Sequence, residues 1–347
     1  MTLEEFLEEW NNDSEQVMVH TSGSTGKPKP MWVEKRRMEA SARITCDFLG
    51  LKKGDTALLC MSLDYIAGKM MVVRSLVRNL KLIVVEPTGN PLANVAVSKI
   101  DFAAMVPMQV YNSLQVPQER ERLKQIKHLI IGGGAIDETM ASELKDFPNY
   151  VWSTYGMTET LSHIALRRLN GPEASEWYKP FPSVEISQND DGCLVIDAPQ
   201  VCSERLVTND IVEISEAGFR IIGRKDNVIC SGGIKIQAEE VERILKPYVH
   251  DPFLITKRKD QKFGEIVVMM VEDRGKATGR RAELGNERKE EREERESLKT
   301  RLQSLCREHL PKYWQPRDFV FVEKLPMTET GKPARKQAEE LATQNYS

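Results

Sequence analysis

The segment His20-Thr-Ser-Gly-Ser-Thr-Gly-Lys-Pro-Lys29 follows a short apolar stretch and precedes a helical pattern that runs from Glu34 to Leu49. Its two glycines allow a ligand to approach the backbone closely, and its hydroxyl and amide groups can hold phosphate oxygens. We therefore interpret the segment as a phosphate-binding loop, with Lys27 adding positive charge. It is not a Walker A loop, because only two residues separate its glycines and a proline follows the lysine. Taken alone, it could also be a surface turn rich in glycine and serine.

The sequence around this loop has the pattern of an α/β fold. From Gln16 to Tyr155, short apolar runs alternate with helical patterns, which predicts a parallel sheet wrapped by helices, with Gln16–His20 as its first strand. From Val184 to Gly223, short strands separated by turn residues indicate a small antiparallel β subdomain. The order then changes to a helix at Ala238–Leu245 and further strands. We expect an N-terminal domain at residues 1–223 and a smaller, mobile α+β C-terminal domain at residues 224–347.

Composition narrows the class of protein. The 347 residues carry a net charge of -3, which gives no broad basic surface and argues against nucleic acid as the main partner. We find no apolar run long enough to span a membrane and no secretory signal, so we expect a cytoplasmic protein. The six cysteines form no CxxC pair and are expected to be thiols in a reducing compartment. The charged stretch from Arg274 to Lys299 is expected to be an exposed helix.

Five stretches of the sequence, in order, resemble the signature motifs of the adenylate-forming acyl-CoA synthetase superfamily. The phosphate loop is the first, and the others are Tyr155–Thr160 (YGMTET), Leu206–Asp210 (LVTND), Gly223–Asp226 with Ser231–Gly233 and Glu239–Glu242, and Leu325–Lys332 (LPMTETGK). The matches cover nearly the whole chain. The resemblance implies an AMP-forming ligase that activates a carboxylic acid with ATP and passes the acyl group to a thiol.

The resemblance also implies how ATP is held. The phosphate loop contributes Thr21, Ser22, Gly23, Ser24, Thr25, Gly26 and Lys27. Tyr155 would stack on adenine, with Gly133 and Gly134 forming the opposite wall of the site.

Four further side chains are implied to contact ATP or its metal ion. Thr158 would bond the α-phosphate, and Glu159 would supply a carboxylate for Mg²⁺. Asp210 would accept hydrogen bonds from both ribose hydroxyls. Arg224 would donate to ribose or phosphate, which makes it, with Thr158, a candidate catalytic residue.

The last motif contains the implied catalytic lysine. Lys332 would neutralise charge on the carboxylate and α-phosphate as pyrophosphate leaves. For thioester formation with CoA, the small domain of the family rotates about the position of Asp226. The loop Ser231, Gly232 and Gly233 would then replace Lys332 near the site and line the pantetheine tunnel.

Within the superfamily, the sequence is most similar to o-succinylbenzoate-CoA ligases of menaquinone biosynthesis. The similarity lies in Ile131–Ala135 (IGGGA), in Cys60–Gly68 (CMSLDYIAG), and in an arginine six residues after Gly68. o-Succinylbenzoate is a dicarboxylate, so one carboxylate reacts and the other needs positive charge. Tyr65, Lys69, Arg74 and His163 are the candidate residues of the acid pocket, and arginine suits a bidentate carboxylate contact.

Some features depart from the family pattern and leave alternatives open. The phosphate loop begins at Thr21, much earlier than in the family, and Asn209 and Tyr65 replace a glycine and a histidine. The chain could be a ligase or adenylation domain for another aryl or acyl acid, or a catalytically silent nucleotide-binding relative. The expected partners are a small carboxylic acid, ATP and CoA. The oligomeric state stays open, with a homodimer as one option.

Overall fold

The computed structural model describes residues 1–20, 30–95, 99–134, 136, 138–273, 287–328 and 333–344. The chain divides into two compact units. The larger unit comprises Met1–Asn189, Leu194–Thr208 and Ile214–Arg220, and the smaller comprises Asp190–Cys193, Asn209–Glu213 and Ile221–Ser347. Phosphate-loop residues Thr21–Lys27 and the implied catalytic Lys332 lie outside the described residues.

The main sheet of the larger unit is parallel over most of its width. Its strands, in sheet order, are β4 (Lys81–Val84), β3 (Thr56–Leu59), β5 (Ile100–Met105), β6 (Ile126–Ile131), β7 (Tyr150–Gly156), β8 (His163–Arg168) and β9 (Lys179–Pro180). The pairs from β4 to β7 are parallel, whereas β8 and β9 add antiparallel strands at one edge. The predicted α/β class is therefore confirmed.

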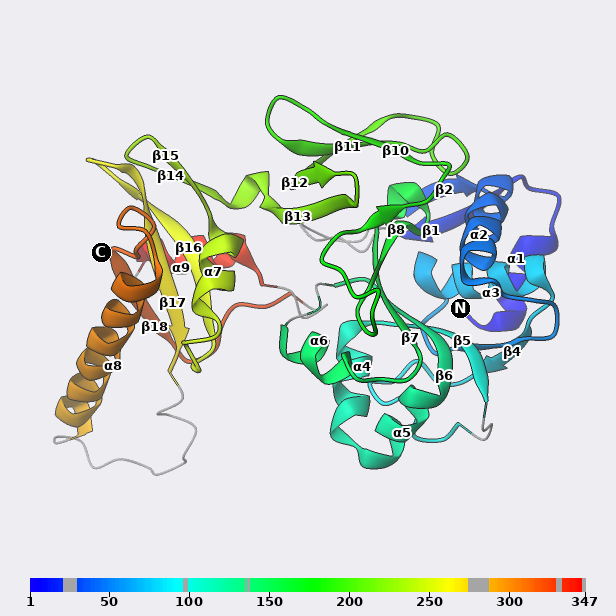
Figure 1. Cartoon of the computed structure of the whole chain (residues 1–347), viewed down its shortest axis with the longest axis horizontal. Helices are drawn as coiled ribbons and strands as arrows, with labels where there is room; N and C mark the ends of the chain where they lie inside the picture. The colour runs from blue at the N-terminus through cyan, green and yellow to red at the C-terminus, as the bar shows by residue number, and fades with distance from the viewer. Residues whose placement is uncertain are drawn as a thin grey trace. The chain divides into compact units, whose positions relative to one another are not determined.

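Helices cover both faces of this sheet. They are α2 (Lys35–Leu49) and α3 (Ile66–Arg78) on one side, and α4 (Pro107–Gln115), α5 (Pro117–Gln125) and α6 (Glu138–Leu144) on the other (Figure 1). Alternate strand residues face opposite layers, so Leu58 packs in a core with Val110 and Leu123, which belong to α4 and α5. Burial on both faces explains why the strand sequences read as continuous apolar runs.

The first predicted strand was assigned to the wrong sheet. β1 (Gln16–His20) pairs antiparallel with β2 (Pro30–Glu34), so that Val17 lies opposite Val33 and His20 opposite Pro30. The nine residues 21–29 between the strands are too few for the crossover of about a dozen that a parallel neighbour needs. The helix α1 (Leu3–Asn11) precedes this hairpin and begins with a capping box between Thr2 and Glu5.

An antiparallel sheet follows the main sheet in the chain, as predicted for residues 184–223. Its strand order is β10 (Glu185–Gln188), β11 (Cys193–Asp197), β12 (Leu206–Ser215) and β13 (Gly218–Arg224).

The smaller unit is an α+β arrangement. Its sheet contains β15 (Ile234–Gln237), β14 (Val228–Ser231), β17 (Gly264–Glu272) and β16 (Phe253–Asp260), with β18 (Asp318–Val322) parallel to β17. The helices are α7 (Ala238–Leu245), α8 (Glu287–His309) and α9 (Arg335–Gln344). Arg295 and Arg301 of α8 bind Asp273 and Asp251, carboxylates outside the helix. Of the helices in the described residues, none is long and apolar enough to cross a membrane.

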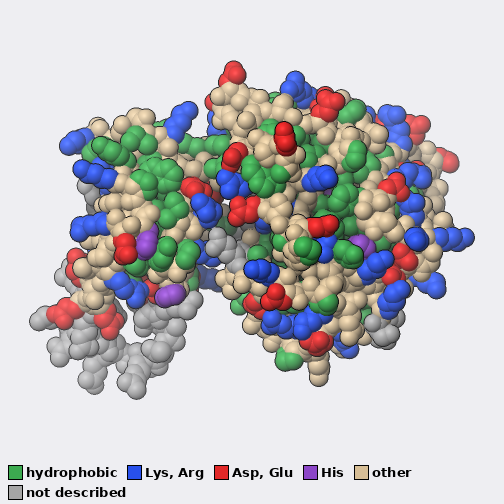
Figure 2. All heavy atoms as spheres, viewed as in Figure 1, with side chains coloured by type: hydrophobic (Ala, Val, Ile, Leu, Met, Phe, Trp, Pro, Cys, Tyr) green, Lys and Arg blue, Asp and Glu red, His purple; other side chains and the backbone are tan. Residues whose placement is uncertain are grey.

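The surface drawn in Figure 2 mixes acidic and basic side chains rather than separating them. The six cysteines are free thiols, as predicted, and Cys60 is so deeply buried that its pKa is raised to about 12.

Gly68 determines how closely α3 approaches the end of β3. A Cβ atom at this position would lie 2.3 Å from the carbonyl oxygen of Ser62 and 2.7 Å from its carbonyl carbon. Backbone atoms cannot move aside as the end of a flexible side chain can. The absence of a side chain at Gly68 therefore fixes the helix that carries Lys69 and Arg74.

We predict that Gly68→Ala destabilises the larger unit, although the same change in an unobstructed helix stabilises it by about 1 kcal/mol. The expected loss is about 1 to 3 kcal/mol, as for other overpacked sites, measured by urea unfolding. Gly89→Ala is the control, because there the nearest atom is the side-chain amide of Asn112, which can rotate. A rise in stability for Gly68→Ala would contradict the assigned contact.

Candidate active site

The glycine loop and the YGMTET motif leave the main sheet side by side. Ile131 of β6 pairs with Ser153 of β7, so Gly132–Gly134 and Tyr155 follow at the carboxyl ends of neighbouring parallel strands. A Cβ atom on Gly132 would lie 2.3 Å from Thr154 Oγ1, and Gly133 has a φ of +78°. Ligands of open α/β sheets bind at such carboxyl ends. The structure thus brings two of the predicted nucleotide-binding segments together.

The turn after Tyr155 is held by its own backbone and one threonine. A Cβ atom on Gly156 would lie 2.3 Å from the carbonyl oxygen of Ser162. Thr160 Oγ1 accepts a hydrogen bond from the Met157 amide and lies 2.7 Å from the Ser162 carbonyl oxygen. Leu161 has a φ of +63°, a backbone region that costs energy for a non-glycine residue.

Within this turn Thr158 is buried and Glu159 is exposed. The exposed carboxylate suits Mg²⁺, which binds proteins through one or two carboxylates and takes its other ligands from phosphates and water. A preformed cage is not required, and the described residues contain no group of three or more His, Cys, Asp or Glu placed to form one.

The ring of Tyr155 is fixed by other aromatic rings. Its centroid lies 5.0 Å from that of Phe219 in an edge-on contact and 5.9 Å from that of Tyr178. The side chain is buried as a result. Stacking of Tyr155 on adenine stays a prediction.

Arg74 is a buried cation behind the turn. The side chain is 2% exposed, and one terminal nitrogen donates to Ser162 Oγ. Its Nε is buried without a hydrogen-bond partner, and no carboxylate among the described residues forms an ion pair with it. Burial lowers the pKa of Arg74 to about 10, so the guanidinium is still charged at neutral pH. A buried charge without a counter-ion costs free energy and marks a candidate functional site.

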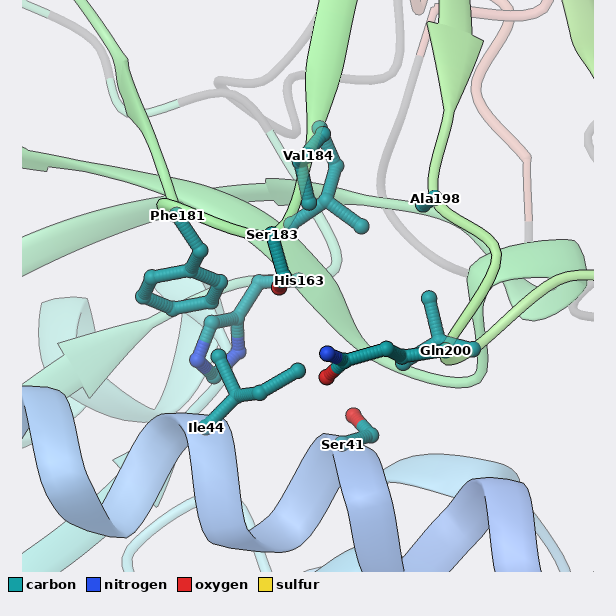
Figure 3. A pocket seen from close by; sticks show the side chains of 10 residues that line it. Ser41, Ile44, His163, Phe181, Ser183, Val184, Ala198 and Gln200 are labelled. Atoms are coloured by element: carbon teal, nitrogen blue, oxygen red, sulfur yellow. The ribbon is translucent and has the colours of Figure 1, made fainter.

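His163 belongs to the same polar network. Its Nε2 lies 3.2 Å from Thr45 Oγ1 of α2, and its Nδ1 lies 3.2 Å from Ser162 Oγ. Burial, and to a lesser degree the charge of Arg74, holds the pKa of His163 well below its ordinary value of 6.5. Figure 3 shows the imidazole facing Ile44 and Phe181. These side chains line a cavity of about 10 Å³, which has room for about one water molecule.

Lys69 does not offer a free charge to a substrate. Its ammonium donates to the Met18 carbonyl oxygen at 2.7 Å, lies 3.3 Å from Glu9 Oε2, and sits over the ring of Phe6. In this structure the side chain connects α3 to α1 and β1, and a role of Lys69 in the acid pocket stays a prediction. Tyr65, just before α3, is 48% exposed.

In the smaller unit, Asp210, Arg224 and Asp226 are brought together. The two terminal nitrogens of Arg224 lie 3.1 Å from Asp210 and 3.1 Å from Asp226. The amide of Asn209 also donates to Asp226, at 3.2 Å. Sequence reasoning treated Asn209 as a departure from the family pattern and missed its bond to the predicted hinge residue.

The Ser231–Gly233 segment is a tight hairpin between β14 and β15. Gly232 and Gly233 have φ values of +59° and +82°, as a two-residue turn between antiparallel strands requires. Ser231 is buried. The turn is therefore rigidly defined, and side chains at Gly232 or Gly233 would strain it.

The ends of the segment that contains Lys332 are described although Lys332 is not. Met327 forms a β-bridge with Pro333, and the Ala334 amide donates to the Pro326 carbonyl oxygen at 2.9 Å.

The sequence carries no signal for Ser162 and Thr45, because their hydrogen-bond partners Arg74 and His163 lie in distant parts of the chain.

Comparison with known proteins assigns the class. The family model for the AMP-binding enzyme matches residues 4–199, and that for the AMP-binding enzyme C-terminal domain matches residues 256–332. The chain therefore belongs to the AMP-binding enzyme family and is an AMP-forming acid–thiol ligase.

Individual relatives agree with this class. A 2-succinylbenzoate–CoA ligase of Listeria monocytogenes is 25% identical over 97% of this chain and 72% of its own length. An acyl-CoA synthetase (AMP-forming)/AMP-acid ligase II-like protein from Dyadobacter fermentans is 34% identical, with a TM-score of 0.63 over 96% of this chain and 91% of that one. The o-succinylbenzoate coenzyme A synthetase of Bacillus subtilis, solved with ATP and a magnesium ion, shares the fold at 22% identity, with a TM-score of 0.69 over 92% of this chain and 69% of that one.

We predict that His163 makes stability fall as the pH drops below 6.5. The unfolded imidazole takes up a proton near its ordinary pKa, whereas the buried one does not, so the unfolded state binds more protons and gains from acid. His128, whose burial lowers its pKa to about 4, acts in the same direction. In His163→Gln, the slope of unfolding free energy against pH between 6.5 and 5 should be shallower by about one proton. If denaturant titrations give the same dependence of unfolding free energy on pH for His163→Gln and for the parent, His163 is not the group responsible.

Proposed function

We propose that this ligase adenylates o-succinylbenzoate with ATP and then transfers the acyl group to CoA. The single observation that supports the choice of acid is Arg74, a buried guanidinium that has no carboxylate partner in the described part of the chain. A substrate that carries a second carboxylate would supply the missing counter-ion. The 2-succinylbenzoate–CoA ligase from Listeria monocytogenes adds support from an independent direction.

The acid would bind through one edge of the Arg74 guanidinium. Nε and one terminal nitrogen form the pair of parallel donors that a carboxylate accepts bidentately. Nε has no partner among the described residues, and the terminal nitrogen binds the Ser162 hydroxyl, which an entering carboxylate would replace. His163 and Thr45 would hold Ser162 in place behind the turn.

The nucleotide would be held by the groups already described. In the larger unit, Gly133, Gly134 and Tyr155 would enclose adenine, and Thr158 would donate to the α-phosphate. Asp210 and Arg224 would bind ribose in the smaller unit. Mg²⁺ at Glu159 would neutralise charge on the phosphates. The phosphate loop Thr21–Lys27 would complete this set.

Two half-reactions would use different parts of the C-terminal domain, residues 224–347. In adenylation, a carboxylate oxygen attacks the α-phosphorus, pyrophosphate leaves, and Lys332 stabilises the charge that develops. In thioester formation, the CoA thiol gives up its proton to solvent and its sulfur attacks the acyl carbon. The bond between the acyl carbon and the bridging oxygen breaks, and AMP leaves with that oxygen and the electron pair of the bond. The hinge at Asp226 would exchange Lys332 for the Ser231–Gly233 hairpin between these steps.

The second candidate is a ligase for another aryl or acyl acid. The relative from Dyadobacter fermentans favours it, because that AMP-acid ligase II-like protein is 34% identical to this chain, against 25% for the ligase from Listeria monocytogenes, and its name specifies no acid. An adenylation domain serving a carrier protein belongs to the same class. A catalytically silent relative is disfavoured, because Thr158, Glu159, Asp210, Arg224 and Lys332 are all retained. Pyrophosphate exchange with a panel of mono- and dicarboxylic acids separates these candidates.

We predict that Arg74→Ala lowers kcat/KM for o-succinylbenzoate by about 30-fold to several thousand-fold, the effect of leaving one buried charge without its partner. The KM for ATP should hardly change. A monocarboxylate analogue should be a poor substrate for the parent protein and should lose little more in the variant, since it never used the arginine.

The matched control is Lys69→Met, on the same helix. It removes a buried cation that the structure assigns to α1 and β1, so it should reduce stability without changing the preference for the dicarboxylate. If Arg74→Ala harms both acids equally, or if the parent prefers the monocarboxylate, the dicarboxylate assignment fails and the second candidate replaces it.

A further inference from the structure

Arg335 forms a bidentate ion pair with Glu242 within the smaller unit, and its Nε also lies 3.8 Å from Glu239. Arg335, the first residue of α9, lies with its terminal nitrogens 3.1 and 2.7 Å from the two carboxylate oxygens of Glu242 on α7. The side chains are 19% and 22% exposed, so solvent screens the pair only in part. Burial alone would lower the pKa of Arg335, but the charge of Glu242, with a smaller contribution from Glu239, outweighs it and raises that pKa above its usual value. On the other side of the pair, burial outweighs the charge of Arg335 and raises the pKa of Glu242.

The same pair is also tied to the sheet. The Ile255 amide on β16 donates to Glu242 Oε1 at 2.7 Å, and Arg335 donates to the Ile255 carbonyl oxygen at 2.8 Å. Both backbone groups of one strand residue are thus bound by the two partners. The pair fixes the first turn of α9 relative to α7 and β16 together.

The helix α9 does not need this pair in order to dock. Ala338 and Ala342 are fully buried in an apolar cluster with Leu254, Ile266 and Val320 of the sheet. The pair fixes the position of the N-terminal end of α9, which directly follows Pro333 and Ala334 in the chain. Those residues form the base of the segment containing Lys332, through the contacts to Pro326 and Met327.

We propose that Arg335 and Glu242 are positioning residues for adenylation. They hold the base of the segment that contains Lys332, which precedes Arg335 by three residues in the sequence. This role rests on the proposed role of Lys332 and goes beyond it, because neither Arg335 nor Glu242 is among the proposed contacts to ATP or acid. Since a displacement of about 1 Å at a catalytic group can cost about 100-fold in rate, loss of the pair should affect adenylation strongly.

The experiment separates the half-reactions. Pyrophosphate exchange reports adenylation, and conversion of pre-formed acyl-AMP to acyl-CoA reports thioester formation. Arg335→Gln and Glu242→Gln should each lower exchange by about 100-fold while changing the thioester step less than about threefold. The double variant should be no worse than either single one, because the two residues act as a pair. Arg335→Lys, which keeps the charge without the fork, should restore part of the exchange activity.

Two controls keep the outcomes distinct. Arg258→Gln breaks another ion pair of the same sheet, with Asp318 at 2.9 Å, and should lower the melting temperature without separating the half-reactions. Lys332→Ala should abolish exchange. If the parent protein shows no pyrophosphate exchange with any of the acids tested, the proposed function fails. If the parent is active, the positioning role is refuted by either of two results for Arg335→Gln: full pyrophosphate exchange, or an equal loss of both half-reactions. It is also refuted if Lys332→Ala retains exchange.

Discussion

The parallel pairing of β6 with β7 is the constraint on which the candidate site depends. The last pair joins Ile131 to Ser153, and β7 continues from there to Gly156. A Cβ atom would lie 2.3 Å from Thr154 Oγ1 at Gly132 and 2.3 Å from the Ser162 carbonyl oxygen at Gly156. A side chain at Gly132 would press on Thr154 of β7, and one at Gly156 would press on the backbone of Ser162 and His163. The same closeness places Ser162 and His163 directly behind the turn, where they meet Arg74 from α3. The same contacts that pack the sheet therefore also assemble the site.

Burial of Arg74 has an energetic consequence for function. A buried charge without a counter-ion destabilises the folded chain. A ligand that supplies the counter-ion would remove this destabilisation, and the free energy regained would favour binding. The neutral His163 next to it avoids a second uncompensated charge, which agrees with the depression of its pKa. Under the proposed function, this cluster would link the choice of acid to the stability of the larger unit.

The sequence predicted the class and many elements well, because those depend on local periodicity. The helix at Ala238–Leu245 has its expected bounds, and the antiparallel sheet and the α/β core were foreseen. The placement of β1 was wrong, since it depends on a partner strand that periodicity does not reveal. For the same reason, the contacts of Lys69 with Glu9 and Met18 were not foreseen. Ser162, Thr45 and the Glu242–Arg335 pair went unassigned for the same reason. The phosphate loop, Lys332 and the hinge motion stay predictions.

Oxygen transfer tests most directly whether the chain forms an acyl-adenylate. o-Succinylbenzoate labelled with ¹⁸O in its carboxylates is incubated with ATP, Mg²⁺ and CoA, and the nucleotide product is analysed by mass spectrometry. Because a carboxylate oxygen attacks the α-phosphorus and stays with it when CoA displaces the acyl group, AMP should gain one ¹⁸O atom per turnover. Formation of ADP, or of AMP without label while acyl-CoA accumulates, would contradict the account.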